Sequence, residues 1–481
     1  MLLDSDQCYR ALRSHDARFD GRFFVGVATT RIYCRPVCTA RTPHREHCRF
    51  FPSAAAAEGQ GFRPCLRCRP ELAPGFAAVD ANRRLAQSAA GMIEDGRLGE
   101  ARLPDVARDL GVTDRHLRRV FQLEFGVSPV EYAQTHRLLL AKRLLTDTDM
   151  AVLDVAMASG FASLRRFNHL FRTRYRMTPA ELRRKTPGRG SAERLSFDLA
   201  YRPPYDWDAM LAFLARRAMA GVEAVDARSY ARTFRLRRGE LAFAGTIRVT
   251  PSPRKAALRV ELSPSFGTVV PSVLARVKQL FDLACHPDEV AGALGPLAQA
   301  HPGLRLPGAM DGFEVAVRAI LGQQVTVQAA SALAGRFVSA FGEPIELPDA
   351  RLRFLFPEAA RIAATAPKRI AALAVVPTRA RAIAALAQEM AAGRLSLEPT
   401  TPVEAACAAL ERIPGVGPWT AQYVAMRALS WPDAFPHPDV AALKAMGERS
   451  AAKALQRSQA WRPWRAYAVL HLWKSLERPL P

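Results

Sequence analysis

The segment LERIPGVGPWTAQYVAMRAL, residues 410–429, places a short turn rich in glycine and proline between two runs of helical character. Pro414 and Gly415 are expected to end the first helix. Gly417 is expected to allow an unusual backbone turn before a second helix begins near Trp419. Glycines without side chains let backbone N–H groups approach a phosphate closely. The segment therefore predicts two helices joined by a hairpin, with Gly415 and Gly417 at a phosphate backbone.

An aspartate follows this hairpin about twenty residues later. The phrase FPHPD ends at Asp439, twenty residues after Trp419. Together the two phrases resemble the helix-hairpin-helix DNA glycosylases, and the resemblance makes Asp439 the catalytic carboxylate, with Asp433 as the alternative. A carboxylate there would stabilise the positive charge that develops on the sugar as an N-glycosidic bond breaks. Trp419 stands where bifunctional members carry a lysine, which implies a monofunctional enzyme that leaves an abasic site uncut.

Residues 195–481 as a whole resemble the AlkA-type 3-methyladenine DNA glycosylases. The matching phrases include YRPPYDWDAMLAFLARRA (201–218), PGLRLPGAMDGFEVAVRAILGQQVTV (302–327) and WRPWRAYAVLHLW (461–473). The resemblance implies that aromatic rings hold a cationic alkylated base through their π faces, after the base has left the stack. It places Trp419, Tyr423, Trp473 and Phe213 in these roles. Gln324 takes the position of a leucine that fills the gap left by the base.

Two close cysteine pairs lie near the start of the chain. Cys34 and Cys38 are followed, after 26 residues, by Cys65 and Cys68. Such pairs predict one tetrahedral Zn²⁺ held by four thiolates. The spacing leaves two roles open. The metal could be a structural staple, or a zinc-bound thiolate could act as a nucleophile.

The phrases FFVGVATTRIYCRPVC (23–38) and FFPSAAAAEGQGFRPCLRCRPE (50–71) closely resemble the N-terminal domain of the Ada adaptive-response proteins. The resemblance implies that Cys34 accepts a methyl group from a methylphosphotriester in DNA. Methylation would change the charge of a four-thiolate zinc site from −2 to −1 and raise its affinity for phosphate. Nearby arginines are candidates for holding the backbone: Arg31, Arg35, Arg41, Arg45 and Arg63.

A helix-turn-helix pattern then occurs twice, over residues 103–132 and 152–182. In the first copy Gly111 suits the turn and Thr113 can cap a basic second helix. The duplication resembles the DNA-binding domain of AraC-type regulators, whose two recognition helices enter successive major grooves. The best candidates for DNA contacts are Arg115, Arg118, Arg165 and Arg166.

Composition supports a partner of opposite charge. The 481 residues carry 68 Lys and Arg against 45 Asp and Glu, a formal net charge of +23. This excess favours nucleic acid, although a proteome that simply prefers arginine would give the same balance. The acidic N-terminus MLLDSDQCYR is unlike a signal peptide, and no apolar run is long enough to span a membrane. We expect a cytoplasmic, nucleoid-associated bacterial monomer without a membrane partner.

The predicted fold is multidomain and mainly α. It comprises a small α+β zinc domain, an all-α tandem helix-turn-helix domain, a linker, a strand-rich α+β subdomain and an all-α helix-hairpin-helix glycosylase domain, at residues 1–78, 80–185, 186–194, 195–280 and 281–481. The predicted partners are double-stranded DNA, alkylated DNA and, for an activator, RNA polymerase. Two alternatives remain: a glycosylase with DNA-binding adaptors and purely structural zinc, or a regulator with an inactive glycosylase half.

Overall fold

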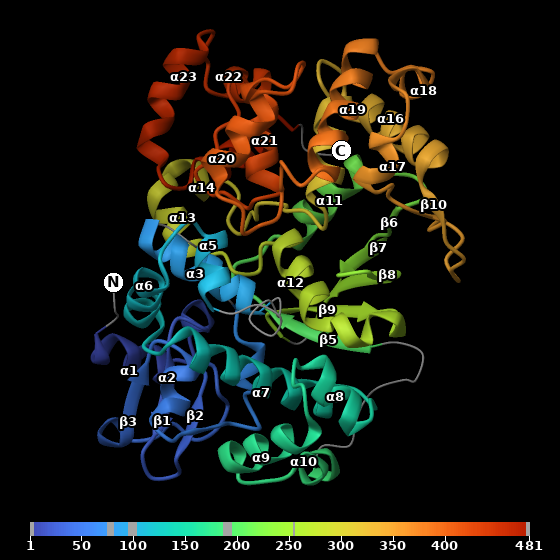
Figure 1. The fold of residues 1–481 in the computed structure, drawn as a ribbon. Coiled ribbons are helices and arrows are strands. Elements are labelled where there is room, and N and C mark those ends of the chain that lie inside the picture. Colours follow the sequence, from blue (N-terminus) through green and yellow to red (C-terminus); the bar gives the residue numbers. More distant parts are fainter. Residues whose placement is uncertain (1–3, 75–80, 95–102, 186–194, 254, 478–481) are drawn as a thin grey trace. The chain divides into compact units, whose positions relative to one another are not determined.

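A computed structural model describes residues 4–74, 81–94, 103–185, 195–253 and 255–477. The expected linker at 186–194 lies outside these ranges. Figure 1 labels the helices and strands of the chain. The chain forms two compact units that do not follow chain order. The first unit comprises Met1–Pro203, Ser252–Lys278 and Leu283–His286, and the second comprises Pro204–Pro251, Gln279–Asp282 and Pro287–Pro481. Among the described residues, no helix is both long and apolar enough to cross a membrane.

A small sheet with strand order β3-β1-β2-β4 opens the first unit. β1 runs antiparallel to β2 and β3, whereas β2 and β4 are parallel. Both faces of the sheet are covered: Val25 packs with Cys34 on one face and Phe24 with Tyr33 on the other, and all four residues are buried. The elements are α1 (Ser5–Arg13), β1 (Phe24–Val27), β2 (Ile32–Cys34), β3 (Cys48–Phe51), α2 (Ala54–Gly59) and β4 (Arg63–Pro64), with short 3-10 helices at Ala17–Phe19, Arg45–His47 and Pro70–Leu72.

The two helix-turn-helix copies are confirmed as α5–α6 and α8–α9. Gly111 and Gly160 hold the two turns with φ of +69° and +79°, a conformation that favours glycine. The Thr113 hydroxyl accepts from the N–H of His116, so it caps α6 as predicted. Ser163 caps α9 in the same way. The elements are α3 (Ala81–Glu94), α5 (Leu103–Asp109), α6 (Asp114–Phe125), α7 (Pro129–Asp147), α8 (Val152–Ala158), α9 (Leu164–Tyr175) and α10 (Pro179–Lys185).

Helix α7 joins the two copies and starts at a capping box. The Ser128 hydroxyl accepts from the N–H of Glu131, whose carboxylate accepts from the N–H of Ser128. The first unit also contains β5 (Leu195–Ala200), which pairs antiparallel with β9 (Ala257–Leu262). A 3-10 helix (Pro264–Val269) and the start of α12 (Val270–Leu280) follow β9.

The second unit combines an antiparallel ribbon with many helices. β7 pairs with both β6 and β8, and these strands confirm the strand-rich expectation. A short pair, β10–β11, interrupts the region expected to be all helical. The elements up to β11 are α11 (Trp207–Arg217), β6 (Glu223–Val225), β7 (Tyr230–Arg238), β8 (Leu241–Pro251), α13 (Pro287–Leu294), α14 (Pro296–Gln299), α15 (Gly312–Leu321), α16 (Val327–Phe341), β10 (Glu343–Pro344) and β11 (Phe354–Leu355).

The remaining helices carry the predicted hairpin between α20 and α21. They are α17 (Ala359–Ala363), α18 (Pro367–Ala371), α19 (Pro377–Ala391), α20 (Val403–Glu411), α21 (Pro418–Arg427), α22 (Val440–Ala445), α23 (Ala451–Arg457) and α24 (Arg465–Ser475), with a 3-10 helix at Ser458–Trp461.

Candidate functional site

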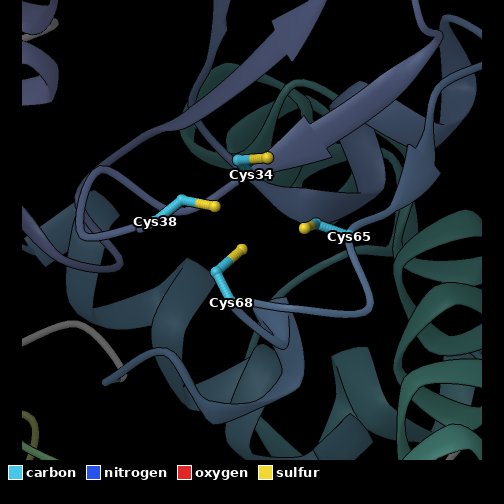
Figure 2. A group of neighbouring side chains, drawn as sticks. All are labelled: Cys34, Cys38, Cys65 and Cys68. Carbon is cyan, nitrogen blue, oxygen red and sulfur yellow. The ribbon is translucent and has the colours of Figure 1, made fainter. Parts of the chain in front are cut away.

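The four paired cysteines converge at one edge of the first sheet. Cys34 ends β2 and Cys65 directly follows β4. Because these strands are parallel neighbours, both leave the sheet at the same edge, and the N–H of Cys65 donates to the carbonyl of Tyr33 at 3.0 Å. Cys38 and Cys68 come from the turns that follow. Figure 2 shows the four sulfur atoms pointing toward a common centre, and all lie within 4.8 Å of one another.

This spacing fits a metal ion. A tetrahedral site with Zn–S bonds of about 2.3 Å requires sulfur atoms roughly 3.8 Å apart. Hydrogen bonds among the four thiols separate their pKa values: hydrogen bonds with Cys34 lower the pKa of Cys65 and bring that of Cys38 to about 7, whereas the pKa values of Cys34 and Cys68 are raised. A bound cation takes the place of thiol protons in such a cluster. The four cysteines therefore form a metal site by geometry and by chemistry.

Arg35, expected at the DNA backbone, instead supports the cysteine cluster. The residue is only 7% exposed, and its side chain donates to both carboxylate oxygens of Asp20. Its Nη1 donates to the carbonyl of Cys68 at 3.1 Å, and its backbone N–H lies 3.3 Å from the Cys68 Sγ. A buried guanidinium with these partners is not available to a phosphate, so this expectation was wrong.

The four arginines predicted to contact DNA are all exposed. Arg115 and Arg118 lie on α6, where Leu117 and Phe121 face inward. Arg118 forms an exposed ion pair with Asp114 at 3.0 Å, which contributes little to stability. On α9, Arg165 and Arg166 lie in the first turn, and they too are exposed. The helices expected to read DNA therefore present exposed basic side chains.

In the second unit, Asp439 is held by three hydrogen bonds. Its Oδ1 accepts from the indole N–H of Trp473 at 2.9 Å and from the backbone N–H of Ala442 at 2.7 Å. Its Oδ2 accepts from the indole N–H of Trp419 at 2.9 Å. The residue is 9% exposed and caps α22. Two tryptophans from different helices thus fix the orientation of one carboxylate.

Three predicted aromatic residues surround this carboxylate. Trp419 and Tyr423 are four residues apart on α21, so they share a face, and their rings stack at 5.2 Å with an angle of 12°. The ring of Trp473 on α24 lies 6.4 Å from that of Tyr423. All three rings are partly exposed. The structure therefore brings these predicted residues together with Asp439.

Phe213 is the exception among the four aromatic candidates. It is buried, and the guanidinium groups of Arg217 and Arg427 lie 3.7 and 5.0 Å from its ring centre. Arg427 also donates to the Tyr423 hydroxyl at 2.7 Å. Although burial opposes the shift, the charges of Arg427, Arg217 and Arg318 lower the pKa of Tyr423. Much of the π surface of Phe213 thus already faces cations of the protein.

The hairpin differs from the sequence expectation at one glycine. Gly415 has a φ of +91°, whereas Gly417 has an ordinary φ of −102°. The left-handed conformation expected at Gly417 is therefore at Gly415. The side-chain amide of Gln323 donates to the carbonyl of Gly415 and to the Thr420 hydroxyl, both at 3.0 Å. This contact anchors the loop that carries Gln324 to the hairpin.

Gln324 is exposed in that loop, between α15 and α16, and its φ is +53°.

Asp433, the alternative catalytic residue, is buried, and the Arg465 guanidinium donates to its two carboxylate oxygens at 2.7 and 2.9 Å. Its charge is thus neutralised within the fold. The anchor at Gln323 and the indole hydrogen bonds to Asp439 could not be predicted, because no local pattern in the sequence marks contacts between distant segments.

Four segments of the chain match protein-family models. They are "Metal binding domain of Ada" at residues 7–71, "Helix-turn-helix domain" at 106–185, "AlkA N-terminal domain" at 196–311 and "HhH-GPD superfamily base excision DNA repair protein" at 317–462.

Several known proteins match all or part of this chain. The "Probable bifunctional transcriptional activator/DNA repair enzyme AlkA" of Mycobacterium tuberculosis is 38% identical over 99% of this chain and 97% of its own. The "DNA-3-methyladenine glycosylase 2" of Escherichia coli is 39% identical over 58% of this chain and 96% of its own. A 3-methyladenine DNA glycosylase structure from Archaeoglobus fulgidus matches with a TM-score of 0.50 and 20% identity, covering 58% of this chain and 97% of that one. The last likeness shows the fold alone. The chain belongs to the family of bifunctional transcriptional activator and DNA repair proteins that join an Ada-type metal-binding domain and a helix-turn-helix domain to an AlkA-type DNA glycosylase.

Proposed function

We propose that the second unit is a monofunctional DNA-3-methyladenine glycosylase and that Asp439 is its catalytic carboxylate. The observation that carries this proposal is the position of Asp439 among aromatic rings, with both oxygens held by indole N–H groups. Asp433 makes a poor candidate, because Arg465 neutralises it. Trp419 and Tyr423 offer π faces to a base that carries positive charge from alkylation.

The chemistry breaks the bond between C1′ of the sugar and the ring nitrogen of the alkylated base. The electron pair leaves with the base, which discharges the positive charge of the base while C1′ becomes cationic. The Asp439 carboxylate stabilises this cation and orients a water molecule. The water oxygen then bonds to C1′ and loses a proton, which gives an abasic site. Each Asp439 oxygen has more than one lone pair, so the indole bonds can persist.

The remaining candidates bind DNA around the reacting base. Gln324 fills the gap left in the duplex, and its exposed position on an anchored loop suits that role. The hairpin holds the phosphate backbone, with Gly415 and Gly417 leaving room for close approach. Phe213 would form a further wall of the base pocket, next to Arg217 and Arg427, whose guanidinium groups lie over its ring. The residue at the position of a lyase lysine is Trp419, so no strand cleavage should follow.

Base release and strand cleavage can be measured on the same DNA. We would incubate the protein with duplex DNA carrying 7-methylguanine or 3-methyladenine and quantify free base by chromatography. The expected result is that each damaged site releases its base, while the DNA strands stay intact until alkali is added. Strands cut without alkali would contradict the monofunctional assignment, and no release of either base would contradict the glycosylase itself.

For the first unit, we propose that the four cysteines hold one Zn²⁺ and that Cys34 accepts a methyl group. The convergence of the four sulfurs at the end of β2 supports this. A Zn²⁺ ion bound there keeps the thiolates deprotonated at neutral pH. The Cys34 sulfur attacks the methyl carbon of a methylphosphotriester, the C–O bond breaks, and the phosphate leaves as a diester anion. Each protein molecule acts once.

Methyl transfer would then raise DNA affinity, because the site loses one negative charge near phosphates. In this proposal DNA is contacted by the exposed arginines of α6 and α9, which are Arg115, Arg118, Arg165 and Arg166. The protein is a monomer, and once bound to DNA it recruits RNA polymerase. Such a protein acts in the cytoplasm at the nucleoid. The domain limits of 1–78, 80–185, 195–280 and 281–481 are part of the same proposal.

The methyl acceptor can be identified by peptide mass spectrometry after incubation with DNA that carries methylphosphotriesters. The expected result is one methyl group on Cys34. The peptide with Cys65 and Cys68 is an internal control, since the sulfur atoms of both belong to the same cluster. An unmodified Cys34 in protein with bound zinc would show that the cluster is structural only.

A further inference from the structure

The cysteine cluster is physically tied to α7, the helix between the two helix-turn-helix copies. Tyr33 directly precedes Cys34, and Arg69 directly follows Cys68. Both side chains point into polar contacts that end on α7. The cluster therefore has one connection to α7 from each of its two cysteine pairs.

The first connection runs through a buried carboxylate, Glu58 of α2. The Tyr33 hydroxyl donates to Glu58 Oε1 at 3.0 Å, and the Thr135 hydroxyl of α7 donates to Oε2 at 3.2 Å. Arg174 of α9 donates to the backbone carbonyl of Glu58 at 3.0 Å. Tyr33 and Glu58 are 0% and 2% exposed. Glu58 thus joins the end of β2 to both α7 and α9.

The second connection is a group of ion pairs. The Arg69 Nη1 lies 2.7 Å from Asp147 Oδ1, and its Nη2 donates to the Thr146 hydroxyl at 3.0 Å. Its Nε donates to Glu71 at 3.0 Å. Lys142 of α7 donates to both oxygens of Glu71 at 2.8 and 2.7 Å. The side chains of Lys142 and Glu71 are 1% and 3% exposed, so water cannot easily replace either partner.

These two connections hold one rigid element at separate points. Thr135 and Asp147 are twelve residues apart on α7, which is roughly 18 Å along the helix axis. Buried polar groups that lose their partners are costly. A shift of the cysteine segments is therefore expected to move α7 rather than to break the contacts. Because α7 follows α6 and precedes α8 and α9, such a movement changes how the two reading helices are placed.

We propose that the state of the cysteine cluster, metal-bound or free and alkylated or not, sets the position of α7 and so regulates DNA binding by the helix-turn-helix copies. The inference rests on the proposed sensing function and adds a second route to it. The charge route acts through space and is screened within about 8 Å at physiological salt. The α7 route acts through buried contacts and persists at high salt.

Hydrogen–deuterium exchange of the full chain tests this coupling without any activity assay. Exchange would be measured by mass spectrometry with Zn²⁺ bound and after removal by a chelator. We expect amides of α7 and α9 to exchange at least about tenfold faster without zinc. Peptides of α15 and α16, which belong to the second unit, are the internal control and should not change.

A matched variant separates coupling from a simple loss of stability. The pair Glu71→Leu with Lys142→Met removes both buried charges together, since removing one alone would leave the other unpaired. In this variant, zinc removal should still speed exchange in residues 31–38 but speed it less in α7 than in the wild-type chain, because the Glu58 connection and the Arg69–Asp147 ion pair remain. Thr135→Val opens only the first connection and serves if the pair variant does not fold. It should reduce the response of α7 to zinc removal.

Two results would overturn the inference: α7 exchange that does not respond to zinc in the wild-type chain, or a full response in the variants. Neither outcome bears on methyl transfer, which is read separately as a methyl group on Cys34. If Cys34 accepts a methyl group but α7 does not respond, the proposed function stands, and the change of charge is the only route from methylation to DNA binding.

Discussion

The substitution Asp439→Asn removes a charge from the proposed active site with almost no change in shape. An asparagine carbonyl at the position of Oδ1 keeps the bonds from Ala442 and Trp473 and still caps α22. Its amide nitrogen then faces the indole N–H of Trp419, where two donors meet. The ring of Trp419 is partly exposed, so water can satisfy this donor. The stability cost should be only about 1 kcal/mol.

The effect on catalysis should be much larger. A carboxylate about 4 Å from a unit positive charge on the sugar contributes about 4 kcal/mol at an effective dielectric constant of 20. This energy corresponds to a rate change of about a thousandfold. We therefore expect Asp439→Asn to slow the release of 7-methylguanine about a thousandfold under single-turnover conditions. Its affinity for DNA with an abasic site should stay close to that of the wild-type protein.

Asp433→Asn is the matched control, because it changes the other candidate carboxylate in the same segment. Asp433 is paired with Arg465, whose side chain is 6% exposed, so the substitution leaves a buried charge unpaired. We expect a loss of about 3–5 kcal/mol in the free energy of unfolding. The release rate per folded molecule should be unchanged. A rate for Asp439→Asn above a tenth of the wild-type value, measured per folded molecule, would refute the role of Asp439.

Three further predictions concern the first unit. Cys34→Ser should abolish methyl transfer, seen as no methylated peptide, while base release stays within about twofold, since Cys34 and the aromatic group belong to different compact units. Replacing Arg165 and Arg166 by Ala should weaken DNA binding and reduce the slope of log K against log salt by about 0.9 for each lost phosphate contact; an unchanged slope would mean that these side chains do not touch the backbone. Burial raises the pKa of Glu58 to about 7 from 4.5. The contribution of Glu58 to the unfolding free energy of the first unit should therefore be largest below pH 4.5. It should fall by about 3 kcal/mol as the pH rises through 7. Glu58→Gln should remove that dependence in denaturant titrations at pH 5 and pH 8.

Local signals in the sequence predicted local structure well. The turn at Gly111 and the cap at Thr113 depend on residues within a few positions of one another, and both are confirmed; Gly160 holds the same turn in the second copy. The hairpin was located correctly, but the left-handed residue is Gly415, not Gly417. Both glycines permit that conformation, and the choice depends on packing. A side chain at Gly415 would lie 3.3 Å from Ala382, a residue of α19 that no local pattern connects to the hairpin.

Distant contacts were not predictable in the same way. Glu58 and Thr135 are 77 residues apart, and Arg69 and Asp147 are 78 apart. A hydrogen bond between such residues leaves no periodic mark in the sequence. Arg35 shows the consequence, because an arginine beside a proposed DNA-reactive cysteine was expected to bind phosphate. The structure pairs it with Asp20, fifteen residues earlier. Sequence shows which residues carry charge, and only the fold shows whether that charge is already neutralised.

The two tryptophans at Asp439 show why residue roles in this site cannot be separated by type alone. An aromatic ring at position 419 or 473 was expected to supply a π face for a cationic base. Each indole also donates its N–H to one oxygen of the same carboxylate. A base that stacks on either ring would therefore contact a side chain that also orients the Asp439 carboxylate. Phenylalanine would keep the π face but lose that bond, because it has no N–H to donate. In the proposed mechanism, tryptophan at both positions would therefore link recognition of the base to the placement of the charge that stabilises the sugar.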